Sequence, residues 1–329
     1  MKHISILVPR GELILSSVIG PYKIFNQVND YLIKTGQRKE PMFDVKLVGL
    51  DATNELYGGA FTIRTDALIS EVKKTDLIII PASPGDIKKS QELNKEFVPW
   101  LQNHYKAGTE IASLCTGAFL LASTGLLNGR SCATHWMAVD AFRQTFTEVK
   151  LTPEKILTDD RGIYSSAGAY SFLNLILYLV EKYCGREVAI FCSKLFQIEI
   201  DRNNQSPFIL FQGQKDHGDD LVKNAQQFIE SQLKGKITVE QLAAMSSLSK
   251  RNFERRFKKA TANTPVEYLQ RARIEVAKKS LETTRENINE VMYSVGYSDS
   301  KAFRTVFKKV TGLSPLEYRN RYNREALQN

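Results

Sequence analysis

Cys115 is the residue of this sequence best placed to do chemistry. The aliphatic run 111–114 predicts a buried strand that leads directly into Cys115, and the small residues after it predict the start of a helix. This pattern is typical of a nucleophile elbow, a sharp turn that presents one side chain above a sheet at a helix N-terminus. A thiol held there is expected to have a lowered pKa. His135, further along the chain, is the candidate base that would pair with it.

The same two residues also fit a purely structural role. A buried cysteine often acts as a small apolar side chain, and a histidine is often hydrogen-bonded within a core. Other reactive groupings are not indicated, because the four cysteines are scattered and no residues show metal-ligand spacing. His217 is interpreted as a solvated linker residue. The sequence therefore predicts free thiols in a reducing compartment, no metal and no cofactor.

The elements that must position Cys115 are alternating strands and helices in the first two hundred residues. Strands are predicted at four short aliphatic runs: 4–8, 45–48, 77–80 and 111–114. Helices are predicted at 21–34, 95–106 and 167–183. This alternation favours a flavodoxin-like α/β fold, a mostly parallel sheet sandwiched by helices. Ligands of such sheets bind beyond the carboxyl ends of the strands.

The positive charge of the chain is concentrated in its last third. The full sequence of 329 residues has a formal net charge of +9. Residues 219–329 contain 21 Lys and Arg against 13 Asp and Glu, so this segment alone carries +8. A local positive field suits a polyanion, because neutralised phosphates release condensed counterions on binding. A solvated basic surface without a partner would have the same composition, so charge alone leaves both interpretations open.

The basic third contains an internal repeat with an offset of 50 residues. Nine of the nineteen residues in 253–271 are identical to those in 303–321, and the register has no gaps. Two copies are too few for a solenoid, so they predict a pair of similar small helical units. The long segment 266–282 between them reads as a connecting helix. Such a helix could hold two reading helices about 34 Å apart, the spacing of successive major grooves.

Each copy has the pattern of a helix-turn-helix, over about 238–259 and about 288–309. In the second helix of each, two phenylalanines four residues apart are expected to face the core. The opposite face is then polar and mostly basic, as a major-groove reader requires, although a solvated helix face would look alike. The candidate DNA contacts are Lys250, Arg251, Glu254, Arg255, Lys258, Ser300, Lys301, Arg304, Thr305 and Lys308.

The second copy resembles the AraC/XylS family of transcription regulators. The resemblance rests on Gly296-Tyr297-Ser298-Asp299, on Phe303 and Phe307, and on Thr311-Gly312-Leu313-Ser314-Pro315. It covers residues 219–329 and implies an all-α domain with two helix-turn-helix units that binds an operator in double-stranded DNA. The resemblance implies activation or repression of transcription as the output, and it leaves RNA polymerase open as a further partner.

The first part of the chain resembles the ThiJ/PfpI superfamily, which has a class I glutamine-amidotransferase-like fold. The motifs are Cys115-Thr116-Gly117-Ala118-Phe119 and Ala133-Thr134-His135-Trp136. Together with the AraC-type segment, the chain is similar to GlxA-like regulators that fuse these two domains. The implied organisation is a sensor domain at 1–200, a linker at 201–218 and a DNA-binding domain at 219–329.

Two departures from the superfamily pattern bear on catalysis. Catalytic members carry an acidic residue shortly before a Gly-Pro pair, and here that position is Ser17 or Ser16. The glycine pair after the third strand is replaced by Ala82-Ser83, which is expected to displace backbone donors for an oxyanion. We therefore interpret the domain as a sensor rather than an enzyme. The effector pocket that the resemblance implies consists of Ser17, Ser83, Cys115, Thr116, Gly117, His135 and Ser166.

The sequence as a whole thus predicts a regulator that binds DNA and responds to a small molecule. We expect a homodimer formed through the N-terminal domain, a cytoplasmic location with nucleoid association on DNA, and no membrane contact, because the apolar runs are too short to cross a bilayer. In the regulator interpretation Cys115 and His135 are vestigial catalytic residues, whereas two alternatives give them a function. One is a cysteine-dependent hydrolase, hydratase or glyoxalase-like enzyme, and the other is a redox sensor acting through oxidation of Cys115.

Overall fold

The chain folds into two compact units, Met1–Gln205 and Ser206–Asn329. The computed structural model describes residues 1–200, 204–215 and 217–323. The segment predicted as a linker, 201–218, is divided between the units, since Gln205 belongs to the first and Ser206 begins the second; positions 201–203 and 216 lie outside the described residues. No helix in the described part of the chain is both long and apolar enough to span a membrane.

The first unit is built on a seven-stranded sheet with the order β10-β11-β7-β6-β1-β2-β5. All neighbouring strands are parallel except β10 and β11, which are antiparallel. The strands are β1 (Lys2–Val8), β2 (Phe43–Gly49), β5 (Ala67–Leu68), β6 (Leu77–Ile80), β7 (Glu110–Leu114), β10 (Leu157–Asp160) and β11 (Ile163–Ser166). Two small sheets accompany it: β3 (Thr53–Leu56) with β4 (Phe61–Arg64), and β8 (Ser131–Cys132) with β9 (Lys150–Leu151).

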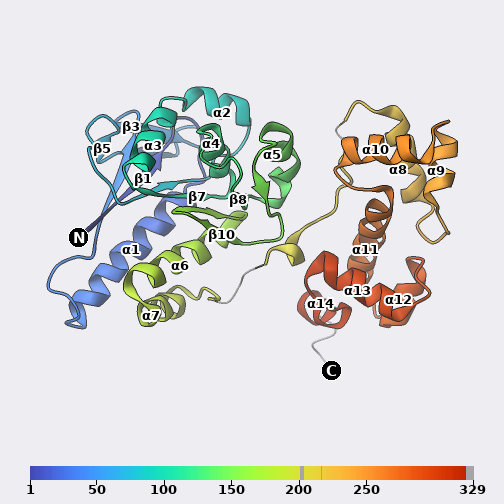
Figure 1. Ribbon diagram of the computed structural model, residues 1–329. Helices are drawn as coiled ribbons and strands as arrows, with labels where there is room; N and C mark the ends of the chain where they lie inside the picture. Colours follow the sequence, from blue (N-terminus) through green and yellow to red (C-terminus); the bar gives the residue numbers. More distant parts are fainter. Residues whose placement is uncertain (201–203, 216, 324–329) are drawn as a thin grey trace. The chain divides into compact units, whose positions relative to one another are not determined.

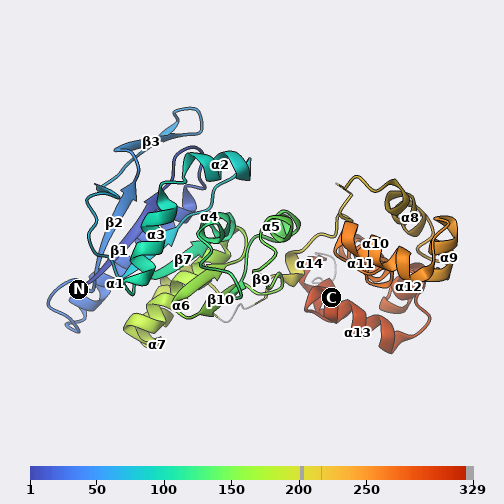
Figure 2. The same cartoon turned by 45° about the horizontal axis from the view of Figure 1, so that its top comes forward.

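Helices cover both faces of this sheet, as the continuous aliphatic strands predict (Figures 1 and 2). One face packs against α1 (Ser16–Lys34), α6 (Phe172–Cys184) and α7 (Arg186–Phe196). The other face is covered by α2 (Ile87–Leu93), α3 (Phe97–Lys106), α4 (Ala118–Ser123) and α5 (Val139–Thr145). Ile79 points to the first face, while Ile78 and Ile80 point to the second. The predicted flavodoxin-like α/β fold is confirmed.

Several element boundaries differ from the sequence prediction. The first helix begins at Ser16 rather than 21, so Pro21 lies inside α1. The helix predicted from 167 begins only at Phe172, because Ala169–Ser171 form a separate 3-10 turn, η3. Strands β10 and β11 and the β3–β4 hairpin were not predicted, since they are short and lack a clear aliphatic run.

The described residues of the second unit form helices and no strands, and they contain two hydrophobic cores. Its helices are α8 (Asp220–Ser231), α9 (Val239–Met245), α10 (Lys250–Thr261), α11 (Pro265–Thr283), α12 (Ile288–Ser294), α13 (Ser300–Thr311) and α14 (Pro315–Tyr322). The first core gathers around Phe253 and Phe257, and the second around Phe303 and Phe307. Helix α11 contributes Tyr268 to the first core and the side chains Ile274, Ala277 and Leu281 to the second.

The 50-residue repeat appears in the structure as repeated geometry. The ring of Phe257 meets that of Tyr268 edge-on at 5.4 Å, and the Phe307 and Tyr318 rings repeat this contact at 5.5 Å. Capping boxes start the helices that follow each reading helix, Thr264 with Glu267 and Ser314 with Glu317. The two helix-turn-helix modules therefore share one architecture.

The turn of the second module packs tightly against the loop after α8. Gly296 has φ of +82°, and a Cβ there would lie 2.6 Å from the carbonyl oxygen of Leu233 and 3.0 Å from Nη2 of Arg273. Arg273 itself donates from Nε to the Leu233 carbonyl at 2.9 Å, and its guanidinium lies over the Tyr297 ring. Gly296 is thus required both for its conformation and for the close approach.

We predict that Gly296→Ala destabilises the second unit by about 2 kcal/mol or more, because strain in the left-handed region alone costs about 1–2 kcal/mol. Urea unfolding followed by circular dichroism measures the change. Gly218→Ala is the matched control, since a Cβ at Gly218 meets nothing within 4 Å. Equal stability of the two variants would contradict this account of the turn.

Candidate nucleic-acid interface and effector site

The structure places Cys115 at a sharp turn at the carboxyl end of β7. Its φ of +55° is left-handed, and it begins the 3-10 turn η1 (Cys115–Gly117) that leads into α4. The hydroxyl of Thr134 donates to the Cys115 carbonyl at 2.9 Å and holds the turn from the side. Cys115 is only 8% exposed. The backbone therefore has the shape of a nucleophile elbow, with a buried thiol.

Burial raises the pKa of the Cys115 thiol, so the predicted lowering is wrong. The backbone N–H groups of Ala169 and Thr116 and the Thr116 hydroxyl favour the thiolate, but less strongly than the loss of solvent disfavours it. The partial positive charge at the N-terminus of α4 offsets little of this rise in pKa, since α4 has only six residues. A thiol in this setting is protonated at neutral pH and weakly nucleophilic.

His135 lies near the same end of the sheet but does not pair with the thiol. Its Nδ1 accepts a hydrogen bond from the Met137 amide at 3.1 Å, and burial lowers the pKa of its ring. The ring packs on Gly168, where a Cβ would come within 2.0 Å of it. Among the hydrogen bonds of the described residues, none joins His135 to Cys115. The structure does not assemble the dyad that a nucleophilic mechanism needs.

Ser17, the position where catalytic relatives of the superfamily carry an acid, is part of the scaffold. It is buried, donates to the carbonyl of Ile14 at 2.6 Å and accepts from the amide of Ala82 at 3.0 Å. The nearby acid Glu12 is engaged elsewhere, because its carboxylate accepts from the Tyr57 amide at 3.1 Å. Neither residue supplies a carboxylate to the elbow.

The backbone amides after β6 are also occupied. The Ala82 amide donates to Ser17, and the Ser83 amide donates to the Thr116 hydroxyl at 3.1 Å. The same hydroxyl donates back to the Ser83 carbonyl at 2.8 Å. Two N–H groups that could have stabilised an oxyanion therefore hold this loop to α1 and to the elbow instead.

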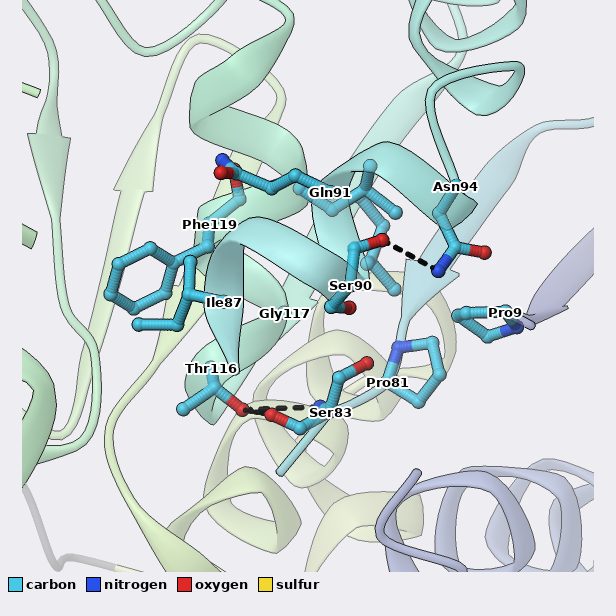
Figure 3. A pocket seen from close by; sticks show the side chains of 12 residues that line it. Pro9, Pro81, Ser83, Ile87, Ser90, Gln91, Asn94, Thr116, Gly117 and Phe119 are labelled. Carbon is cyan, nitrogen blue, oxygen red and sulfur yellow. Dashed lines mark hydrogen bonds between the residues drawn. The ribbon is translucent and has the colours of Figure 1, made fainter. Parts of the chain in front are cut away.

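A narrow pocket lies beside the elbow, on the side of α2 and α4 (Figure 3). Three of the predicted pocket residues line it: Ser83, Thr116 and Gly117. The other four, Ser17, Cys115, His135 and Ser166, do not line it. Ser166 is fully buried, and its hydroxyl has no hydrogen-bond partner among the described residues.

The far wall of this pocket was missed by sequence reasoning. Ile87, Ser90 and Gln91 of α2, and Asn94 just after it, line that wall (Figure 3). The only signal in the sequence was the position of this short helix directly after a strand of a parallel sheet, where ligands bind. No charged side chain is found among the lining residues, and the hydroxyls of Ser83 and Ser90 have no hydrogen bond within the described part of the chain.

The second unit presents α10 and α13 with their phenylalanines buried and their polar residues outward. Nine of the ten predicted DNA contacts are exposed, and Glu254 is half-buried. One of the nine, Lys250, is engaged within the module, because its ammonium lies 2.7 Å from the Glu240 carboxylate. Residues Arg304, Thr305, Lys308 and Lys309 border a shallow hollow on α13.

The three arginines of α10 are not equivalent. Arg256 forms an ion pair with Asp219, the N-cap residue of α8. Arg251 and Arg255 are exposed and have no ion pair within the described residues. Only these two are therefore free to meet a ligand, a distinction that the sequence alone did not make.

Comparison with known proteins agrees with this geometry. Residues 18–182 match the DJ-1/PfpI family and residues 242–321 match a helix-turn-helix domain family. The chain belongs to the DJ-1/PfpI family. Its DJ-1/PfpI domain is followed by an AraC-type helix-turn-helix unit, which confirms both resemblances seen in the sequence.

Similar proteins include transcription regulators that align with most of this chain. The HTH-type transcriptional regulator GbdR of Pseudomonas aeruginosa is 24% identical over 93% of this chain and 80% of its own length. A Vibrio parahaemolyticus crystal structure superimposes with a TM-score of 0.52 and 23% identity, covering 59% of this chain and 98% of that one. An AraC family transcriptional regulator from Pseudomonas putida gives a TM-score of 0.50 at 17% identity, covering 60% and 100%. These structures support the fold of the first unit.

We predict that Cys115 reacts with iodoacetamide at pH 7 at least about tenfold more slowly than a free thiol, since burial raises its pKa and limits access. Because the pKa is raised, the rate should keep increasing with pH beyond the range where an ordinary thiol has levelled off. Peptide mapping by mass spectrometry measures the rate, with urea-unfolded protein as the control. A fast reaction that is complete at pH 6 would contradict this description of the elbow.

Proposed function

We propose that this protein is a transcription regulator whose second unit reads two adjacent segments of the DNA major groove and whose DJ-1/PfpI unit binds a small effector. The observation that carries the proposal is the matched pair α10 and α13, each with a buried phenylalanine pair and an exposed basic face. The HTH-type transcriptional regulator GbdR, which aligns with 93% of this chain, supports it.

The roles of the exposed side chains follow from the chemistry of the groove. Arg251, Arg255 and Arg304 suit guanine, whose O6 and N7 accept two hydrogen bonds from one guanidinium. Lys258 and Lys308, near the ends of their helices, suit phosphates. The exposed face of α13 also includes Ser300, Lys301 and Thr305. Lys250 becomes part of the exposed face of α10 when its ion pair with Glu240 opens on DNA.

We place the effector in the pocket between α2 and the elbow. Free hydroxyls and an amide face it and no charged side chain lines it, so it suits a small polar molecule with no large net charge. Cys115, His135 and Ser166 do not line this pocket, so we assign them no contact with the effector. Binding there would bias the unit between two arrangements and so alter DNA binding.

The DJ-1/PfpI unit acts as a sensor and not as an enzyme in this proposal. A protonated thiol, a histidine engaged by Met137, a serine in the acid position and two occupied amides support that reading. The same raised pKa disfavours the redox-sensor alternative, because oxidation begins from the thiolate. We also propose a cytoplasmic homodimer formed through this unit, since two-fold symmetry suits paired operator sites, with RNA polymerase as a further partner.

We predict that Arg255→Ala weakens binding of the full-length protein to its selected operator by about tenfold or more, because a bidentate guanine contact is lost. The operator is obtained by selection from random duplexes, and affinity is measured by fluorescence anisotropy at fixed salt. Arg256→Ala is the matched control on the same helix, and we expect a change below about threefold, since Asp219 already holds that side chain. Equal losses in both variants would mean that only net charge matters.

A second prediction tests the effector site. We expect a thermal-shift screen of uncharged polar metabolites to find ligands that stabilise the wild-type protein, and Ser90→Trp to abolish that shift by filling the pocket. His135→Ala should keep the shift, because His135 does not line the pocket. A shift lost in His135→Ala but kept in Ser90→Trp would move the effector to the thiol side of the elbow.

A further inference from the structure

The two reading helices provide equivalent frames in which single residues can be compared. Helices α10 and α13 each have 12 residues and each begin after a side-chain N-cap, Ser249 in one and Asp299 in the other. Each ends at a left-handed residue, Ala262 or Gly312. Position 254 of the first helix therefore corresponds to position 304 of the second, both one residue after the first buried phenylalanine.

The two modules carry opposite charges at this matching position. Residue 254 is a glutamate and residue 304 is an arginine. Glu254 is half-buried at the side of its helix, and its carboxylate has no hydrogen bond or ion pair within the described residues. Of the two lysines four residues away, Lys250 and Lys258, Lys250 directs its ammonium to Glu240 and interacts with Glu254 only through longer-range electrostatics. Arg304 is exposed and likewise has no ion pair in the part of the chain that the structure describes.

A carboxylate on a basic DNA-reading face needs a donor from the DNA. Phosphates offer none, and guanine O6, guanine N7 and thymine O4 are acceptors that would repel it. The major groove offers two donors, N4 of cytosine and N6 of adenine. Cytosine N4 is the usual partner of a glutamate, since adenine N6 lies on the same base edge as the acceptor N7. An arginine has the reverse requirement and pairs with guanine O6 and N7.

We propose that the two modules read opposite bases at their matching position, with Glu254 selecting cytosine and Arg304 selecting guanine. This inference rests on the proposed function of α10 and α13 as the reading helices. The next pair of matching positions also differs in the base it suits. Arg255 suits guanine, whereas the Thr305 methyl group suits the methyl group of thymine.

The consequence is a directional operator. Although the modules share one architecture, their subsites are not interchangeable, and a protein placed on the DNA in reverse would bring Glu254 against guanine acceptors. Such a repulsive contact disfavours the reversed orientation, just as an attractive contact favours the correct one. The chain therefore binds in one direction, which fixes the order of its modules relative to a promoter.

The test is selection of random duplexes by full-length wild-type protein and by Glu254→Arg and Arg304→Glu. We expect Glu254→Arg to invert one C·G pair to G·C in one subsite, with a preference of about tenfold, and to leave the other subsite unchanged. Arg304→Glu should make the reverse change in the other subsite. Lys259→Ala, an exposed lysine on α10, is the matched control and should weaken binding to all sequences alike.

The outcomes separate this inference from the proposed function. An enriched wild-type operator that keeps the same bases in Glu254→Arg would overturn the specificity inference and leave DNA reading by the unit intact. The inference would likewise fail if both subsites carry the same base at the positions that the two variants affect. If the wild-type protein enriches no sequence, the proposed function itself is wrong.

Discussion

Helix α11 is packed into two hydrophobic cores at once, and the reading surface depends on that packing. Tyr268 closes the first core against Phe257, while Leu281 and its neighbours form the floor of the second. Arg273, in the middle of the helix, bonds to the loop before the first module's α9 and stacks on Tyr297 in the turn of the second. The two modules are therefore joined by buried contacts as well as by a continuous helix, and α10 and α13 are held at a set separation. A flexible tether would allow the same side chains to bind DNA without fixing which grooves they meet.

The DJ-1/PfpI unit has the backbone of a nucleophile elbow, and the polar groups around that elbow bond to one another. The strained turn at Cys115 persists, yet the groups that would activate a nucleophile serve the scaffold: Ser17 bonds to Ala82, and Thr116 bonds to Ser83. Each bond satisfies a polar group that would be costly to leave buried and unpaired. The result is a rigid floor at the carboxyl edge of the sheet, next to a pocket lined by neutral polar groups. Such a site suits the binding of a small polar molecule.

Features that depend on short stretches of sequence could be predicted, and features that depend on distant residues could not. The reading helices follow from phenylalanines four residues apart and from a gap-free repeat, both of which are local. The pKa of Cys115 was predicted in the wrong direction because it is set by burial under elements far along the chain. The bond between Ser17 and Ala82 spans 65 positions, and the ion pair of Arg256 with Asp219 spans 37. Neither pair has a spacing pattern that sequence reasoning could detect.

The central claim is that one rigid unit reads two adjacent major-groove segments, and its most direct test is the dependence of affinity on operator spacing. Full-length protein is titrated against its selected operator and against operators with about 5 or about 10 base pairs inserted between the subsites, half a helical turn and a full turn. Because α11 is buried in both cores, the account predicts that either insertion reduces binding to the level of random DNA. Affinity that is unchanged, or that recovers at the full-turn insertion, would show that the modules move independently and would contradict the account.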